Sequence, residues 1–133
     1  MTMIQLPLVV SEDVVRMRQT LKEEMVKLGF TVIEQTKMIT AASELARNTL
    51  RYGGGGHAEI DVLTQAGKRG VLAAFVDQGP GIENLDLAFT DGYTSGGGMG
   101  LGLPGARRLA DEFEIETAPG QGCRVTIIKW KAF

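Results

Sequence analysis

The chain has little of several features that would assign it to a secreted, membrane or nucleic-acid-binding class. Its single cysteine, Cys123, cannot form an internal disulfide, so the fold does not depend on an oxidising compartment. No targeting segment is visible, and the longest apolar run, 71–76, is far shorter than the ~20 residues of a membrane helix. A formal net charge of −2 provides no basic excess for nucleic acid. We therefore expect a cytoplasmic protein that binds neither nucleic acid nor membrane.

The length and composition indicate one globular domain. A chain of 133 residues suffices for one hydrophobic core and is short for two. Apolar residues make up 44% of the chain and charged residues 23%, as is typical of globular proteins. Residues 1–133 are therefore expected to form a single domain.

Apolar periodicity predicts three helices and five strands. The strands are expected at 4–10, 58–64, 70–77, 113–117 and 124–131, and the helices at 11–28, 34–52 and 101–110. Ser11 is the expected N-cap of the first helix, and 65–69 is the expected hairpin loop. The order β-α-α-β-β-loop-α-β-β predicts an α/β sandwich (α+β), with helices on one face of a mixed, mostly antiparallel sheet.

Four residues, Glu44, Asn48, Arg51 and Tyr52, share one face of the second predicted helix. A carboxylate and a carboxamide one turn apart can divide the work of phosphoryl transfer. Glu44 can polarise an attacking hydroxyl, and Asn48 offers a neutral oxygen to Mg²⁺, which prefers oxygen ligands. A solvated helix face, with Glu44 paired to Arg47 or Arg51, is the alternative, and taken alone this cluster favours that interpretation.

A second cluster, Asp77-Gln78-Gly79-Pro80-Gly81, directly follows a predicted strand. The aspartate can accept a hydrogen bond from an exocyclic amine, and the glycines let the backbone approach a flat ring. Aspartate, glycine and proline are also the usual residues of turns, so taken alone this segment favours an ordinary turn.

The third cluster holds five glycines within eight residues, Gly96-Gly97-Gly98-Met99-Gly100-Leu101-Gly102-Leu103, before the short predicted helix. Uncovered backbone N–H groups at a helix N-terminus form a phosphate cradle. The stretch Gly100-x-Gly102-x-x-Gly105 also matches the dinucleotide fingerprint. That match is rejected because 91–97 cannot be the strand that must precede it, and no acidic residue follows at the required distance.

Together and in this order, the three clusters resemble the GHKL ATPase superfamily, whose fold is the Bergerat α/β sandwich. Glu44-x-x-x-Asn48-x-x-Arg51-Tyr52 resembles its N box, Asp77-x-Gly79-x-Gly81 its G1 box, and Gly98-x-Gly100-x-Gly102 its G2 box. The similarity spans nearly the whole chain. Its details are most similar to the RsbT-type serine/threonine switch kinases of the stressosome and of anti-sigma regulation, as in Gly102-Leu103-Pro104-Gly105 and Ile128-Lys129-Trp130.

The resemblance implies a role for each of these residues. Glu44 would be a general base or orienter, Asn48 would bind Mg²⁺, and Asp77 would hold the adenine amino group. Arg18 on the first helix matches a position of a transfer-assisting arginine, although a surface ion pair is the simpler explanation. The other ATP-binding candidates are Arg51, Tyr52, Gly79, Gly81, Ile82, Gly96, Gly97, Gly98, Met99, Gly100, Leu101 and Gly102, and 85–95 is a candidate lid.

The resemblance also implies an activity and partners. The chain would be an ATP- and Mg²⁺-dependent protein serine/threonine kinase that phosphorylates a STAS-domain protein and activates a PP2C-type phosphatase. The alternatives are an anti-sigma kinase that binds a sigma factor directly, and a catalytically weak nucleotide-binding switch. One departure places nucleotide affinity in doubt: the third glycine box usually ends in threonine, and here it reads Gly120-Gln121-Gly122-Cys123.

Overall fold

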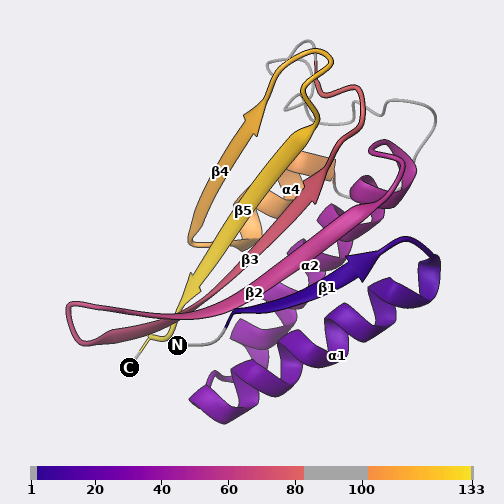
Figure 1. Cartoon of the computed structure of the whole chain (residues 1–133). Helices are drawn as coiled ribbons and strands as arrows, with labels where there is room; N and C mark the ends of the chain where they lie inside the picture. The colour runs from indigo at the N-terminus through magenta and orange to yellow at the C-terminus, as the bar shows by residue number, and fades with distance from the viewer. Residues whose placement is uncertain (1–2, 83–101, 133) are drawn as a thin grey trace.

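The computed structural model describes residues 3–82 and 102–132, which form one sheet layer and one helix layer (Figure 1). The strands are β1 (Ile4–Leu8), β2 (Gly56–Gln65), β3 (Lys68–Asp77), β4 (Glu112–Thr117) and β5 (Cys123–Trp130). The helices are α1 (Ser11–Leu28), α2 (Val32–Arg51) and α4 (Gly102–Leu109). The predicted order of elements and the α/β sandwich are therefore confirmed.

The strand order is β1-β2-β3-β5-β4, and each of the four pairings is antiparallel. Two successive helices carry the chain away from β1 and back, so that β2 begins beside the end of β1, with Leu8 opposite Gly56. β3 and β4 run in the same direction, but β5 lies between them. A mixed sheet would contain at least one pair of parallel neighbouring strands. Among the described strands, no neighbouring pair is parallel.

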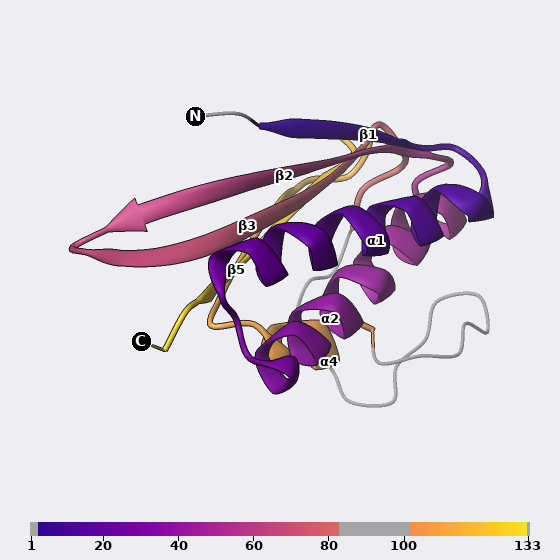
Figure 2. The same cartoon turned by 90° about the horizontal axis from the view of Figure 1, so that it is seen from below.

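All three described helices cover the same face of the sheet, and α2 lies between α1 and α4 (Figure 2). The largest fully buried side chains come from both layers and include Met17, Leu21, Met25, Met38, Leu45, Ile60, Phe75 and Ile127. Burying each of them contributes about 1.5–3 kcal/mol. No described helix or strand covers the opposite face of the sheet.

The helix starts differ from the predictions in their caps. Ser11 is the first residue of α1 and not its cap. The Asp13 carboxylate instead accepts the N–H groups of Val9 (2.8 Å) and Val10 (3.0 Å). Helix α2 begins at Val32, earlier than predicted, because the Thr31 hydroxyl accepts the N–H of Glu34 (3.1 Å) in a capping box. No described helix has the length and hydropathy of a membrane span.

The β2–β3 connection is tighter than predicted. The expected loop at 65–69 is wrong, since Gln65 pairs with Lys68 and only two residues make the turn. Ala66 and Gly67 have φ of 52° and 81°, as a type I′ turn requires. Alanine rarely adopts a positive φ, so Ala66 does not indicate a two-residue turn at this point.

Candidate functional site

The C-terminal half of α2 carries the first group of candidate residues. Glu44 is buried, Asn48 is half-buried, and Arg51 and Tyr52 are exposed. The Arg51 guanidinium lies over the Tyr52 ring, 5.9 Å from its centroid. The four residues therefore follow one side of the helix from the interior to the surface, as their spacing predicted.

Glu44 does not lie on a solvated helix face, because it is only 8% exposed. Arg47 is the one ion-pair partner among the described residues, and its Nη1 is 4.0 Å from Glu44 Oε1, at the outer limit of an ion pair. The Glu44–Arg47 ion pair, which the interpretation as a solvated helix face predicted, is thus present, but its N···O distance is long. A carboxylate without a short ion pair is sterically open to a hydroxyl group brought beside it, which is the geometry that a general base requires.

Gly53 joins the end of α2 to Asp77 at the end of β3. The Asn48 carbonyl accepts the N–H groups of Tyr52 (2.9 Å) and Gly53 (3.2 Å), which closes the helix. A Cβ added to Gly53 would lie 2.3 Å from Cγ of Asp77, so the carboxyl group fills the space that a side chain would need. The structure therefore brings the first and second candidate clusters into contact through Gly53, which is not among the predicted site residues.

Asp77 is held in place by further contacts with the backbone. Its Oδ1 accepts the N–H of Gly79 at 2.9 Å. A Cβ added to Gly79 would lie 2.7 Å from the Cα of Gly53, and one added to Gly122 would lie 2.4 Å from the Asp77 carbonyl oxygen. Burial raises the pKa of the Asp77 carboxyl above its ordinary value of 3.8, and the bond from Gly79 opposes this shift.

Thr117 anchors the loop that follows Asp77. Its hydroxyl donates to the Gly122 carbonyl (2.7 Å) and accepts the N–H of Ile82 (3.0 Å). Gly81 has φ of 76°, and an added Cβ would lie 2.1 Å from the Ala118 carbonyl oxygen. Thr117 is not among the predicted site residues, because its role depends on β4 and the Asp77 loop meeting across β5.

Cys123 lies in the same row of the sheet as Asp77 and Thr117, which are its partners on β3 and β4. It is a half-buried free cysteine. Burial, followed by the negative charge of Asp77, raises the pKa of the thiol to about 11. The thiol is therefore protonated at neutral pH and is a poor nucleophile.

The remaining candidates are only partly placed. Gly102 opens α4, which packs on α2, while Gly96, Gly97, Gly98, Met99, Gly100 and Leu101 lie outside the described residues, as does the candidate lid. Arg18 is exposed on α1 and makes no hydrogen bond or ion pair within the part of the chain that the structure describes. The ion pair considered for it is formed by Arg16, with Asp13 at 3.0 Å.

The donor set suits a magnesium ion that is bound mainly by a nucleotide. Within residues 3–82 and 102–132, no group of three acidic, histidine or cysteine side chains could hold a metal by itself. Asn48 offers one half-buried amide oxygen on the turn of α2 that ends beside Asp77. Mg²⁺ commonly takes one or two protein oxygens and completes its shell with phosphates and water, so Asn48 fits this role.

Comparisons with known proteins show the family of the chain. The family described as histidine kinase-, DNA gyrase B-, and HSP90-like ATPase matches residues 33–132. The chain is 41% identical over 118 residues to the serine/threonine-protein kinase RsbT of Bacillus subtilis, covering 89% of each protein. It is 27% identical over 108 residues to an anti-sigma F factor of Clostridium beijerinckii, covering 77% of this chain and 76% of that one.

Two solved structures share the fold. One contains the RsbU and RsbW domains of a Mycobacterium tuberculosis protein, with a TM-score of 0.66 and 16% identity. That match covers 97% of this chain but only 32% of the other. The second belongs to the SiaB–SiaC complex of Pseudomonas aeruginosa, with a TM-score of 0.55, 14% identity, and coverage of 98% and 89%. At these identities the likeness supports the fold alone.

Proposed function

The chain belongs to the histidine kinase-, DNA gyrase B- and HSP90-like ATPase family and is a homologue of the serine/threonine-protein kinase RsbT. From this premise we propose that it is a cytoplasmic, ATP- and Mg²⁺-dependent protein kinase. It phosphorylates a serine or threonine of a STAS-domain protein and activates a PP2C-type phosphatase by contact. The observation that carries the proposal is a buried, weakly paired Glu44 one turn before Asn48, on a helix whose end holds Asp77 in place.

The proposed reaction moves the γ-phosphoryl group of ATP to the oxygen of a serine or threonine hydroxyl. The bond from the γ-phosphorus to the β–γ bridging oxygen breaks, ADP leaves, and the hydroxyl proton passes to the carboxylate of Glu44. Asp77 fixes the adenine ring by accepting a hydrogen bond from its amino group. Asn48 would hold Mg²⁺, which neutralises phosphate charge when bound. Catalysis of this kind rests on positioning and charge neutralisation.

The direct test combines phosphoryl transfer with nucleotide binding. Radiolabelled γ-phosphate should move from ATP to a STAS-domain protein of the same organism, and chelation of Mg²⁺ should stop this transfer. In calorimetry, Asp77→Ala should lower ATP affinity at least tenfold, because an adenine donor would lose its partner in a site that is partly closed to water. ATP binding without transfer to any STAS-domain protein would instead favour an interaction switch that is catalytically weak.

The shifted pKa of Asp77 predicts a pH dependence of ATP binding. The carboxylate form accepts the bond from adenine, and its pKa lies above 3.8 in the free protein. ATP affinity should therefore be highest above that pKa and should fall as the pH falls through it. The fall should begin at a higher pH than it would if an exposed aspartate made the contact. Asp77→Asn should bind ATP weakly and should lose this pH dependence. An unchanged pH profile in Asp77→Asn would show that another group is responsible.

An anti-sigma kinase that binds a sigma factor directly is the second candidate function. It is favoured by the 27% identity to an anti-sigma F factor over 77% of this chain. Affinity purification of the tagged protein distinguishes the two functions. Recovery of a sigma subunit of RNA polymerase supports the second candidate, and recovery of a STAS-domain protein and a phosphatase supports the first.

A further inference from the structure

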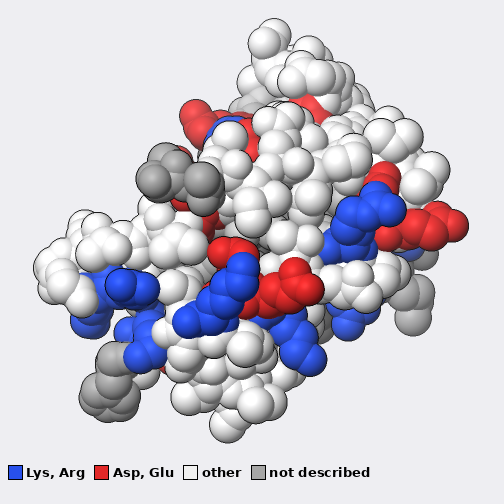
Figure 3. All heavy atoms as spheres, turned by 60° about the horizontal axis from the view of Figure 1, so that its bottom comes forward, with Lys and Arg blue, Asp and Glu red and all other residues white. Residues whose placement is uncertain are grey.

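A basic hollow lies at the end of the molecule opposite Asp77. It has a volume of about 320 Å³ and is lined by Leu28, Gly67, Lys68, Arg69, Lys131 and Ala132. In Figure 3, basic side chains gather between the tip of the β2–β3 hairpin and the C-terminal end of the chain. Lys68 and Asp77 are the two ends of β3, so the hollow is roughly 30 Å from the candidate nucleotide site at about 3.3 Å per residue.

The charge of this hollow is unusual for a chain with a formal net charge of −2. Three of its six lining residues are basic and none is acidic. Within the described residues, the exposed side chains of Lys68 and Arg69 make no hydrogen bond or ion pair. Like charges held close together repel each other, and an anion placed between them would relieve that repulsion.

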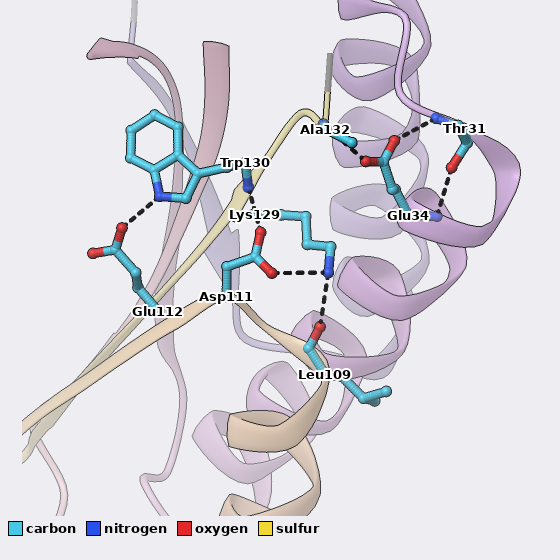
Figure 4. Close-up of polar contacts among 8 residues, drawn as sticks. All are labelled: Thr31, Glu34, Leu109, Asp111, Glu112, Lys129, Trp130 and Ala132. Atoms are coloured by element: carbon cyan, nitrogen blue, oxygen red, sulfur yellow. Dashed lines mark hydrogen bonds and ion pairs between the residues drawn. The ribbon is translucent and has the colours of Figure 1, made fainter. Parts of the chain in front are cut away.

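The walls of the hollow are fixed by hydrogen bonds. The N–H of Lys131 donates to the Arg69 carbonyl at 2.9 Å, which joins the C-terminal segment to the hairpin. The two carboxylate oxygens of Glu34 accept the N–H groups of Thr31 (2.8 Å) and Ala132 (3.1 Å), as Figure 4 shows. Both oxygens of the Glu34 carboxylate are thus occupied by backbone donors. A site that is held open in this way loses little conformational freedom when a ligand binds.

Three further interactions hold the end of β5, as the same figure shows. The Asp111 carboxylate accepts the N–H of Trp130 (2.7 Å) and pairs with the Lys129 ammonium (3.2 Å) (Figure 4). The Trp130 indole N–H donates to Glu112. These bonds fix β5 as far as its last residue, Trp130. Lys131, the next residue, is thereby positioned at this side of the hollow.

Exposed apolar side chains adjoin the hollow. Val32 and Ile33 begin α2, directly before Glu34, whose carboxylate accepts the N–H of the lining residue Ala132. Their exposed fractions are 75% and 69%. Gly29, which precedes them, lies beside the Lys131 side chain. Basic and apolar groups together match a polypeptide better than an inorganic anion, which has no use for apolar surface.

We propose that this basic hollow docks an acidic polypeptide segment of a partner protein, with the segment's carboxylates at Lys68 and Arg69 and its apolar side chains against Val32 and Ile33. The separation from Asp77 lets a partner remain bound here while nucleotide enters and leaves. The site goes beyond the proposed kinase activity and does not depend on it.

The test is binding of a fluorescein-labelled peptide of Glu-Glu-Leu repeats, measured by fluorescence anisotropy. The wild type should bind it saturably, and Lys68→Glu/Arg69→Glu should weaken binding at least tenfold, because both attractions become repulsions. The matched control is Arg16→Glu/Arg18→Glu, which makes the same change of net charge on exposed positions of the first half of α1, far from Leu28 along that helix. The control should bind like the wild type. No saturable binding to the wild type, or equal binding by the two variants, would overturn the proposal.

Two further arms identify the ligand class. A peptide of Glu-Glu-Ser repeats should bind more weakly than the leucine peptide, and neither tripolyphosphate nor phosphatidylserine vesicles should displace the leucine peptide at equal charge concentration. Equal binding of the serine peptide, or ready displacement by either competitor, would overturn a polypeptide site. ATP affinity should be the same in the wild type and Lys68→Glu/Arg69→Glu, so that failure here is distinguishable from failure of the nucleotide site.

Discussion

Replacing Glu44 by glutamine is expected to lower the rate of phosphoryl transfer by about 10²–10⁴-fold, the contribution of a positioned general base. Glutamine has nearly the same shape but cannot accept the proton of the attacking hydroxyl. Glu44 is buried, and the Arg47 guanidinium is 4.0 Å from it, so the substitution removes no short ion pair. ATP affinity should stay within about threefold of the wild type, since no adenine or phosphate contact is assigned to this residue. Single-turnover transfer and calorimetry measure the two quantities separately.

Two variants serve as controls for Glu44→Gln. Glu23→Gln makes the same chemical change on the exposed surface of α1 and should transfer at the wild-type rate. Glu44→Asp keeps a carboxylate but shortens the side chain by one methylene. Its rate of phosphoryl transfer should lie between those of the wild type and Glu44→Gln. Transfer at the wild-type rate by Glu44→Gln would exclude the general-base role. Parallel loss of ATP affinity and transfer would indicate that Glu44 supports the site structurally.

The secondary structure could be predicted largely because its signals are local. Met17, Leu21 and Met25 recur on one face of α1, and all three are buried as that periodicity requires. The capping of α1 and the two-residue hairpin turn were not predicted, because they depend on individual hydrogen bonds and backbone angles and not on apolar periodicity. The N–H groups before α1 are bound by Asp13, and the two-residue hairpin needs a positive φ at Ala66.

The candidate site could be predicted less completely than the fold. The face shared by Glu44 and Asn48 follows from helical spacing, but the burial of Glu44 depends on how α2 packs between its neighbours. Gly53, Gly122 and Thr117 were missed as site residues because each acts through a contact distant in the sequence. Glycines at turns are common, and only the structure shows which of them leave space for the Asp77 carboxyl.

Gly53→Ala is therefore expected to impair nucleotide binding more than stability. The added Cβ would lie 2.3 Å from Cγ and 2.5 Å from Oδ2 of Asp77, so the carboxyl group must turn away from the position that fits adenine. We expect ATP affinity to fall at least tenfold by calorimetry. Gly53 is not among the glycines with positive φ, so its backbone tolerates alanine and most of the cost falls on Asp77.

Gly54→Ala is the matched control on the adjacent residue. Its added Cβ would meet no atom within 4 Å, but its φ is 75°. The left-handed backbone should therefore cost roughly 1 kcal/mol of stability, while ATP affinity should be unchanged. The two alanine variants thus separate the nucleotide site from the stability of the fold, and equal ATP affinities in both would contradict the assigned contact. In the double variant Gly53→Ala/Asp77→Ala, affinity should be no lower than in Asp77→Ala alone, because the glycine acts through a carboxyl group that is no longer present.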